Sequence, residues 1–386
     1  MNQAAMLRRG ALVISLVLAA SCASNKDDKP AKLTEITPTL AVQRSWDVKL
    51  GAAAPKLRLG LTLASLDNRF FAANHGGEVS AFETATGKRV WRTKLKAPLS
   101  AGPGAGNGLV VVGSSKGDLI ALDAATGAKR WGVKLASEVL SAPAVAGDLV
   151  LARTVDGKLH GLAVANGDER WAATEQVPRL SLRGTGETVI SDDLAISGFD
   201  NGRLVAVNLA NGNNAWEATV AQPRGSSELQ RLVDVDGTIV VSGTDVFAVS
   251  YQGRAVRVAR DTGQVLWTRD LSSYRGLAAD DSALYVSTTE GDVVRLDRRT
   301  GAEVWRQKAL ARRALSAPVI MGSHVVVADY EGVVHWLDAA SGDFQARAET
   351  KARVSAPPVV LDDELLVLND EGKINAYRIS APLAQR

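Results

Sequence analysis

The stretch LDAATGAKRW, residues 122–131, combines the end of one strand, a tight turn and the start of a second strand that carries a tryptophan. Asp and Thr before Gly127 favour a hairpin in which the glycine takes a left-handed conformation. Because the pattern recurs along the whole chain, it decides the fold. Its copies end at Trp91, Trp131, Trp171, Trp216, Trp267, Trp305 and, with alanine in place of tryptophan, Ala346.

Each copy belongs to a unit of about forty residues, a period typical of repeat folds. Ten residues before each turn glycine lies another glycine, in short turns such as KGD (116–118) and EGD (290–292). Between the turns, apolar residues alternate or form β-branched blocks, which indicates strands. An upstream segment such as SAPAVAGD (141–148) supplies a fourth strand. Four strands per unit predict a propeller blade, and beyond the leader no segment keeps a helical period.

The two ends of the chain complete the ring. An eighth glycine turn, at Gly372, begins a unit that lacks its outermost strand. The segment QRSWDVKLG (43–51) has Trp46 in the tryptophan position and supplies that strand, which removes two exposed edges. We therefore expect an all-β, eight-bladed β-propeller over residues 41–380. Its blades are four-stranded and antiparallel, and an N-terminal strand completes the last blade.

The repeat tryptophans suit a structural role. Seven of the eight tryptophans, from Trp46 to Trp305, occupy one equivalent position, and Trp336 lies on a third strand. One large aromatic residue per blade is what the packing of neighbouring blades requires, whereas a cofactor site needs one or two unique residues. We therefore predict that these side chains pack between blades.

The N-terminus has the features of a secretory leader. Arg8 and Arg9 precede the apolar run ALVISLVLAA (11–20), which is too short to span a bilayer. Residues 1–21 are thus expected to be a signal peptide, with a membrane anchor as the weaker alternative. The mature chain would have 43 basic residues, the 45 of the full chain less these two arginines, against 42 acidic ones. This balance does not fit a nucleic-acid-binding protein.

Cys22 is the only cysteine, so the chain cannot form an internal disulfide. The stretch LAASC resembles a bacterial lipoprotein box, with Ala19 where leucine is usual. The resemblance implies a lipid on Cys22 and, with Ala23 after it, anchoring in the outer membrane facing the periplasm. Residues 22–40 would be the lipidated cysteine and a flexible polar tether. The alternative is an unmodified cysteine beside an ordinary cleavage site.

Two blades are preceded by long connections. From each repeat tryptophan to the next blade's first glycine the intervals are 31, 26, 26, 31, 37, 24 and 27 residues. The neighbouring excesses fall in residues 173–187 and 220–237, and in an up-and-down blade such connections share one face of the disc. This patch combines apolar and charged residues, which suits a protein interface. The residues of this patch are Leu180, Leu182, Arg179, Arg183, Arg231, Glu228, Asp234 and Asp236. The alternative is that long surface loops are tolerated without a function.

Signals for catalysis are missing. The four histidines, His75, His160, His324 and His335, are scattered over different units without metal-ligand spacing. The stretch GPGAGNG (102–108) does not match a dinucleotide fingerprint, and no GxSxG motif occurs. We therefore expect no catalytic residue, no metal and no cofactor.

Over nearly its whole length the chain resembles the family of the outer membrane protein assembly factor BamB. The stretches PRLSLRG (178–184) and SSELQRLVDVDG (226–237) carry the more specific part of this resemblance. It implies a non-enzymatic scaffold of the β-barrel assembly complex that binds the periplasmic POTRA domains of the insertase BamA. The implied contacts are Leu180, Leu182, Arg183, Asp234 and Asp236, the residues that the long connections also indicate. Strand augmentation of unfolded outer-membrane clients is a further expectation.

Two other functions fit the same repeat. Pyrroloquinoline quinone dehydrogenases resemble it, but they need a metal-bound quinone, and many stack it on a vicinal disulfide that a chain with only Cys22 cannot form. The chain is also short for that family. A propeller that binds cell-wall sugars is the other alternative, and it would need a buried central group of Asn, Asp and Trp.

Overall fold

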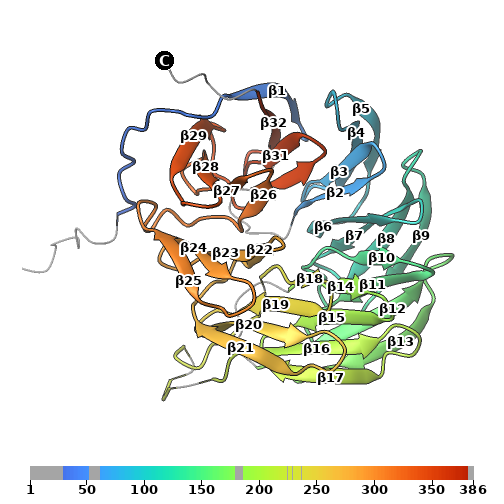
Figure 1. Cartoon of the computed structure of the whole chain (residues 1–386). Coiled ribbons are helices and arrows are strands. Elements are labelled where there is room, and N and C mark those ends of the chain that lie inside the picture. Colours follow the sequence, from blue (N-terminus) through green and yellow to red (C-terminus); the bar gives the residue numbers. More distant parts are fainter. Residues whose placement is uncertain are drawn as a thin grey trace, which may run out of the picture.

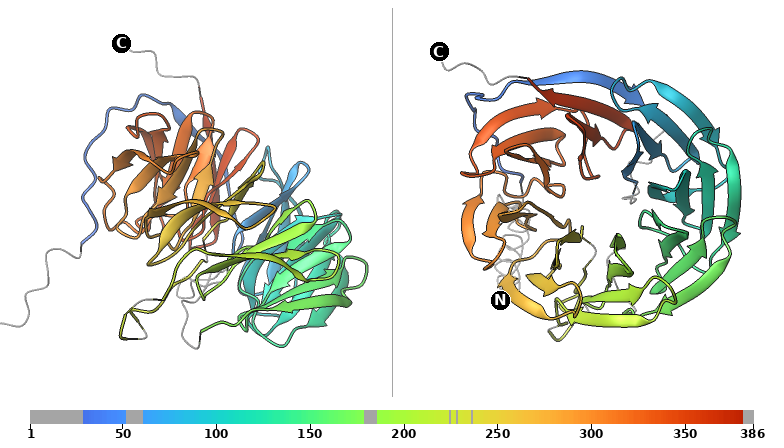
Figure 2. Two further views of the ribbon diagram at one scale, coloured as in Figure 1. Left: turned by 60° about the horizontal axis from the view of Figure 1, so that its bottom comes forward. Right: turned by 45° about the vertical axis from the view of Figure 1, so that its right-hand side comes forward.

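The computed structural model describes residues 29–51, 61–178, 186–223, 225–227, 229–235 and 237–380. Within these ranges, thirty-two strands form eight four-stranded sheets in which neighbouring strands are antiparallel (Figure 1). The sheets stand side by side in a ring (Figure 2, right). The predicted all-β, eight-bladed propeller is therefore confirmed. In the described part of the chain, no helix is long and apolar enough to cross a membrane.

Each blade consists of one strand from each of four concentric positions, and the blades are numbered 1 to 8 in chain order. The innermost strands are β2 (Leu63–Leu66), β6 (Leu99–Gly106), β10 (Ala144–Ala146), β14 (Val189–Ser191), β18 (Val240–Ser242), β22 (Leu277–Ala279), β26 (Val319–Met321) and β30 (Val359–Leu361). The second strands are β3 (Arg69–Ala73), β7 (Leu109–Ser114), β11 (Leu149–Arg153), β15 (Leu194–Gly198), β19 (Asp245–Val249), β23 (Ala283–Ser287), β27 (His324–Ala328) and β31 (Glu364–Leu368). The third strands are β4 (Glu78–Glu83), β8 (Asp118–Asp123), β12 (Lys158–Ala163), β16 (Arg203–Asn208), β20 (Arg254–Ala259), β24 (Val293–Asp297), β28 (Val333–Asp338) and β32 (Lys373–Ile379). The outermost strands are β5 (Arg89–Lys94), β9 (Lys129–Lys134), β13 (Glu169–Thr174), β17 (Asn214–Thr219), β21 (Val265–Asp270), β25 (Glu303–Gln307), β29 (Phe344–Glu349) and β1 (Val42–Lys49).

The last blade joins both ends of the chain. Its strand order is β1-β32-β31-β30, and β1 pairs antiparallel with β32 from Val42 opposite Ile379 to Lys49 opposite Lys373. The N-terminal strand thus covers the outer edge of β32 with a ladder of hydrogen bonds. The predicted closure of the ring is confirmed.

The two glycines of the repeat differ in how regularly they adopt a left-handed conformation. The glycine between the third and outermost strands is left-handed wherever that hairpin exists, as at Gly127 with φ 73°. Between the second and third strands the glycine is also left-handed in most blades, as at Gly117 with φ 83°. Blade 5 departs from the expectation, because Gln252 has φ 49° there and Gly253 does not have a positive φ.

The repeat tryptophans pack between blades, as predicted. Trp131 donates its indole N–H to the carbonyl of Val164 in the next blade at 2.8 Å, and its ring lies against Gly167 in the next blade's outer hairpin. The same ring-on-glycine contact recurs for Trp46, Trp91, Trp171, Trp216, Trp267 and Trp305, on Gly87, Gly127, Gly212, Gly263, Gly301 and Gly342 respectively. The repeat motif is therefore an inter-blade wedge, and its glycine is required on the receiving side.

Ala346 replaces the tryptophan where no receiving hairpin exists. Blade 8 has no turn between its third and outermost strands, since these come from opposite ends of the chain. Residues 29–41, here named the strap, cover this seam instead. The amides of Thr39 and Leu40 donate to the carbonyl of Gln345 at 3.0 and 3.2 Å. The Leu40 side chain is buried in the same apolar cluster as Ala346.

Candidate functional site

The long connections leave the disc on one face. In every blade, the connection to the next blade and the turn between the second and third strands lie on the same side, because consecutive strands run antiparallel. This side is named the connection face. The connections from β13 to β14 and from β17 to β18 are the two long ones, and they are neighbours. In Figure 2, left, the described yellow-green part of the second connection extends well beyond the strands.

The second connection presents one exposed apolar side chain. Leu229 is 70% exposed, more than any other large apolar residue in the described ranges. Leu229 lies in a local turn that two hydrogen bonds stabilise. The backbone amide of Gln230 donates to the Ser227 hydroxyl at 3.2 Å, and the side-chain carbonyl of Gln230 accepts from the Ser226 amide at 3.0 Å. Leu229 and Gln230 also line a shallow hollow with Gly225 and Gln252. Such a projecting leucine on a hydrogen-bonded turn can act as an apolar anchor.

The base of this connection is fixed to several blades. Val235 is fully buried and sits on Gly198, where an added Cβ would fall 2.1 Å from the Val235 carbonyl oxygen. The amide of Tyr251 donates to the carbonyl of Asp234 at 2.8 Å, and Thr238 forms a parallel bridge with Gly276. Blades 4, 5 and 6 therefore all hold the base, while the segment around Leu229 projects from it.

A buried ion pair stiffens the neighbouring junction. Nη2 of Arg153 lies 2.7 Å from Oδ1 of Asp200, with side-chain exposures of 1% and 3%. The same guanidinium donates to the Gly198 carbonyl and stacks 4.4 Å from the centre of the Phe199 ring. Because Gly198 also carries Val235, one arginine links blade 3, blade 4 and the base of the second connection. Arg suits this role, since its planar fork can bind a carboxylate and a carbonyl together.

Two carboxyl groups flank the described ends of the first connection. Burial raises the pKa of Glu187, which lies just before β14. Burial also raises the pKa of Glu175, which lies just after β13, and the nearby Glu217 carboxylate adds to this shift. These carboxyl groups hold their protons more tightly than exposed ones do, because their charged forms are less well solvated.

The structure describes only one of the five predicted partner-binding residues. Asp234 is 2% exposed and lies at the base of the second connection, where its carbonyl accepts a hydrogen bond from the Tyr251 amide. Leu180, Leu182, Arg183 and Asp236 lie outside the described residues, as does the predicted lipidation site Cys22. The sequence patterns did not single out Leu229. Its signal was a single leucine flanked by polar residues in the longest insertion.

The histidines are part of the scaffold. His75 contacts the carbonyl of Leu99 at 2.8 Å, His160 contacts Glu169 at 2.6 Å, and His324 contacts Gln345 at 2.8 Å. His335 lies 2.9 Å from Asp329 in another buried network. Within the described ranges, no group of three or more His, Cys, Asp or Glu side chains could hold a metal ion.

Comparison with known proteins identifies the family. The sequence profile described as "Outer membrane protein assembly factor BamB" matches residues 75–307 and 289–381. The outer membrane protein assembly factor BamB of Pseudomonas aeruginosa is 43% identical over 373 residues, which cover 96% of this chain and 98% of that protein. The chain belongs to the BamB family.

Solved structures agree with this assignment. The crystal structure of BamB from Moraxella catarrhalis superposes with a TM-score of 0.82 at 31% identity, covering 88% of this chain and 100% of that one. A europium-containing methanol dehydrogenase has a TM-score of 0.71 at 13% identity, covering 90% of this chain and 95% of that one. The second likeness shows a shared propeller fold alone. The BamB-family chain thus shares its architecture with a methanol dehydrogenase but its sequence with assembly factors.

Proposed function

We propose that this BamB-family chain is a non-catalytic component of the outer-membrane β-barrel assembly complex. It binds the periplasmic POTRA domains of BamA through its connection face and so supports the folding and insertion of outer-membrane proteins. A lipid on Cys22 anchors it in the outer membrane, facing the periplasm. The signal peptide (1–21), the lipidated cysteine with its tether (22–40) and the propeller (41–380) divide the chain accordingly, and the part of the tether from residue 29 onward is the strap that contacts blades 7 and 8.

The projecting turn around Leu229 is the observation that carries this proposal. It combines the most exposed large apolar side chain of the described residues with a base that three blades hold in place. A fixed base lowers the entropy lost when a partner binds, and an apolar anchor beside charged residues supplies affinity and orientation. Leu180, Leu182, Arg183 and Asp236 belong to the same surface in this proposal, and Asp234 shapes it from below.

The binding affinity of purified POTRA domains for matched variants tests the site. Leu229→Asp and Arg183→Glu should each weaken binding at least about tenfold, as expected for residues near the centre of an interface. Val304→Asp and Lys88→Glu are the controls. Val304 is 51% exposed on the outer rim, and Lys88 is exposed on the opposite face. Equal affinity for all four variants and the unchanged chain would place the interface elsewhere.

A further inference from the structure

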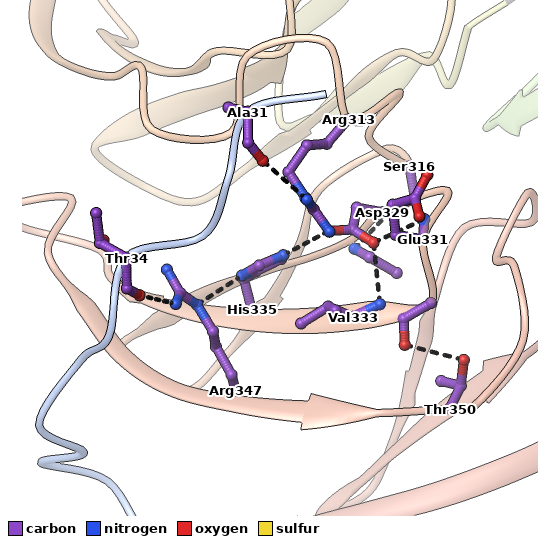
Figure 3. A network of polar contacts seen from close by, with 12 residues as sticks. Ala31, Thr34, Arg313, Ser316, Asp329, Glu331, Val333, His335, Arg347 and Thr350 are labelled. Atoms are coloured by element: carbon purple, nitrogen blue, oxygen red, sulfur yellow. Dashed lines mark hydrogen bonds and ion pairs between the residues drawn. The ribbon is translucent and has the colours of Figure 1, made fainter. Parts of the chain in front are cut away.

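The strap is held on blade 7 by two arginines. Arg313 donates from Nη1 to the carbonyl of Ala31 at 2.9 Å, and Arg347 donates from Nη1 to the carbonyl of Thr34 (Figure 3). The amide of Ala31 donates to the carbonyl of Ala311 at 2.9 Å, and Leu33 packs against the apolar cluster between blades 6 and 7. The first half of the strap is therefore held by two arginines in addition to one backbone bond and one apolar contact, whereas backbone bonds hold residues 39–41.

Both arginines join one buried pair formed by His335 and Asp329. Arg347 donates from Nε to Nδ1 of His335 at 3.2 Å, and Nε2 of His335 lies 2.9 Å from Oδ2 of Asp329. Arg313 donates from Nε to the same Asp329 oxygen at 2.6 Å. An arginine can only donate, so Nδ1 of His335 must be the acceptor and its proton must reside on Nε2. The four side chains form one chain of hydrogen bonds, seen end to end in Figure 3.

The charges and the burial around His335 disfavour a second proton on its ring. Among the elements packed around it, the charged groups that face it are Asp329 after β27, Arg347 on β29 and Arg313 on the connection from β25 to β26. Its sheet neighbours Val327 and Leu337 face the apolar cluster shared with blade 6. With neutral His335 this group already has two cations and one anion. Protonation would add a third cation at a site that is 0% exposed.

We propose that His335 is a proton-sensitive latch for the strap: a proton taken up at its Nδ1 displaces the Arg347 hydrogen bond, places a third cation beside Arg313, and so weakens both arginine contacts until residues 31–38 leave blade 7. The proton comes from solvent, and no covalent bond changes. Arg347 is only partly buried and can turn outward, which withdraws its hydrogen bond from Thr34. Residues 39–41 stay in place, because backbone bonds to Gln345 and Ser380 hold them.

Burial supports this arrangement energetically. Desolvation lowers the pKa of His335 below its ordinary value of 6.5, against the opposing hydrogen bond to Asp329. The neutral form is therefore the one that the closed strap requires. If the chain is lipid-anchored, as the proposed function has it, the released eight residues lengthen the tether by at most about 28 Å at the usual extended rise per residue. Acid would then loosen the disc from a fixed position near the membrane.

Hydrogen exchange of the full mature chain, read residue by residue between about pH 8 and about pH 5, tests the latch across the ordinary histidine range. After correction for intrinsic rates, the protection of the Ala31 amide should fall by up to about tenfold for each pH unit between the ordinary histidine pKa of 6.5 and the lowered pKa of His335 under the closed strap, the slope for uptake of one proton. The amides of Thr39 and Leu40 should keep their protection. A pH-independent Ala31 amide in the unchanged chain would overturn the proposal.

Two histidine variants separate the latch from general acid effects. His335→Gln keeps a donor for Asp329 and an acceptor for Arg347 but cannot take up a proton, so the pH response of Ala31 should vanish. His324→Gln changes the other histidine of blade 7, which contacts Gln345 at 2.8 Å, and the response should remain. The reverse pattern would contradict the latch. Arg347→Met removes the bond to Thr34 and should lower the protection of Ala31 at every pH, and this readout involves neither lipid nor partner.

Discussion

The indole ring of Trp131 lies directly on Gly167 of the next blade: a Cβ placed on Gly167 would fall 2.7 Å from Cε3 of that ring. Gly167 also has φ 79°, a conformation that other residues rarely adopt. The turn glycine of one blade and the tryptophan of the blade before it therefore form one unit, repeated around the ring. Their spacing in the sequence reflects a contact between blades and not within one.

Replacing this glycine should destabilise the propeller. Gly167→Ala should cost roughly 2–5 kcal/mol of unfolding free energy, from left-handed strain together with overpacking against the ring. Gly147→Ala is the matched control, since Gly147 has φ 56° but nothing within 4 Å of an added Cβ. It should lose only the conformational part, about 1–2 kcal/mol. Urea unfolding measures both, and equal losses would show that the tryptophan contact contributes nothing.

The buried Arg153–Asp200 pair should matter far more than an exposed one. Arg153→Met leaves the Asp200 carboxylate buried without its cation and should cost about 3–5 kcal/mol of unfolding free energy. Arg203→Met breaks a pair with Glu217 whose side chains are 46% and 48% exposed, and it should cost less than about 1 kcal/mol. The double variant Arg153→Met with Asp200→Leu should regain much of the loss. Chemical denaturation measures the unfolding free energy of each variant. A loss below about 1 kcal/mol for Arg153→Met would show that Arg153 does not link blades 3 and 4 energetically.

A tryptophan restored at position 346 should harm the protein. Ala346 is 3% exposed under the strap residue Leu40, and no outer hairpin of blade 8 is present to receive a ring. Ala346→Trp should therefore cost about 1–3 kcal/mol or more through overpacking, although it restores the repeat consensus. Ala348→Trp, two residues along the same strand, is the comparison variant. The difference between the two losses of stability shows how much of the cost is specific to position 346. Thermal unfolding of both variants provides the comparison, and a stabilised Ala346→Trp would contradict the explanation of the seam.

Acidification should weaken the fold in two steps. The lowered pKa of His335 means that the folded chain binds fewer protons than the unfolded one, so stability falls as the pH drops from above 6.5 towards the folded value. Burial alone would raise the pKa of Asp329, but hydrogen bonds from His335 and Arg313 lower it, so its contribution is lost only below 3.8. Each pKa unit of separation corresponds to about 1.4 kcal/mol.

The carboxyl groups of Glu175 and Glu187 act in the opposite direction. Because their pKa values are raised above 4.5, the folded chain binds more protons than the unfolded chain in this window. Stability from these two groups therefore increases as the pH falls from their raised pKa values towards 4.5. Unfolding free energies of the unchanged chain and of His335→Gln, measured across this range, isolate the histidine step by difference. Identical pH curves for the two proteins would rule out His335 as its source.

Much of the fold follows from the sequence, because each blade repeats the same local signals. The hairpin glycines, the alternating strands and Trp46 are enough to predict the number of blades and the closure of the ring. Nothing comparable predicts the course of the strap. Its residues mix polar and apolar types without a regular period, and Leu40 is buried only because Ala346, far away in the chain, leaves space for it. The packing of His335 depends in the same way on Arg313 and Arg347, which belong to other elements.

The candidate site was less predictable than the fold. The lengths of the connections indicated which face to consider, but length carries no information about which side chains project. Leu229 is exposed because Ser226, Ser227 and Gln230 form a local turn, whereas Asp234, five residues later, is buried by contacts with other blades. The family resemblance pointed to Asp234 and not to Leu229, and the exposure of each residue became visible only in the folded loop.

The most direct test of the central claim is a pulldown of the full-length protein from detergent-solubilised outer membranes, with mass spectrometry of the proteins recovered. The account predicts recovery of the barrel insertase with the unchanged chain and with Val304→Asp, and its loss when Leu182 and Arg183 are changed together. Recovery of no insertase, with a quinone or a sugar retained on the propeller instead, would contradict the scaffold function.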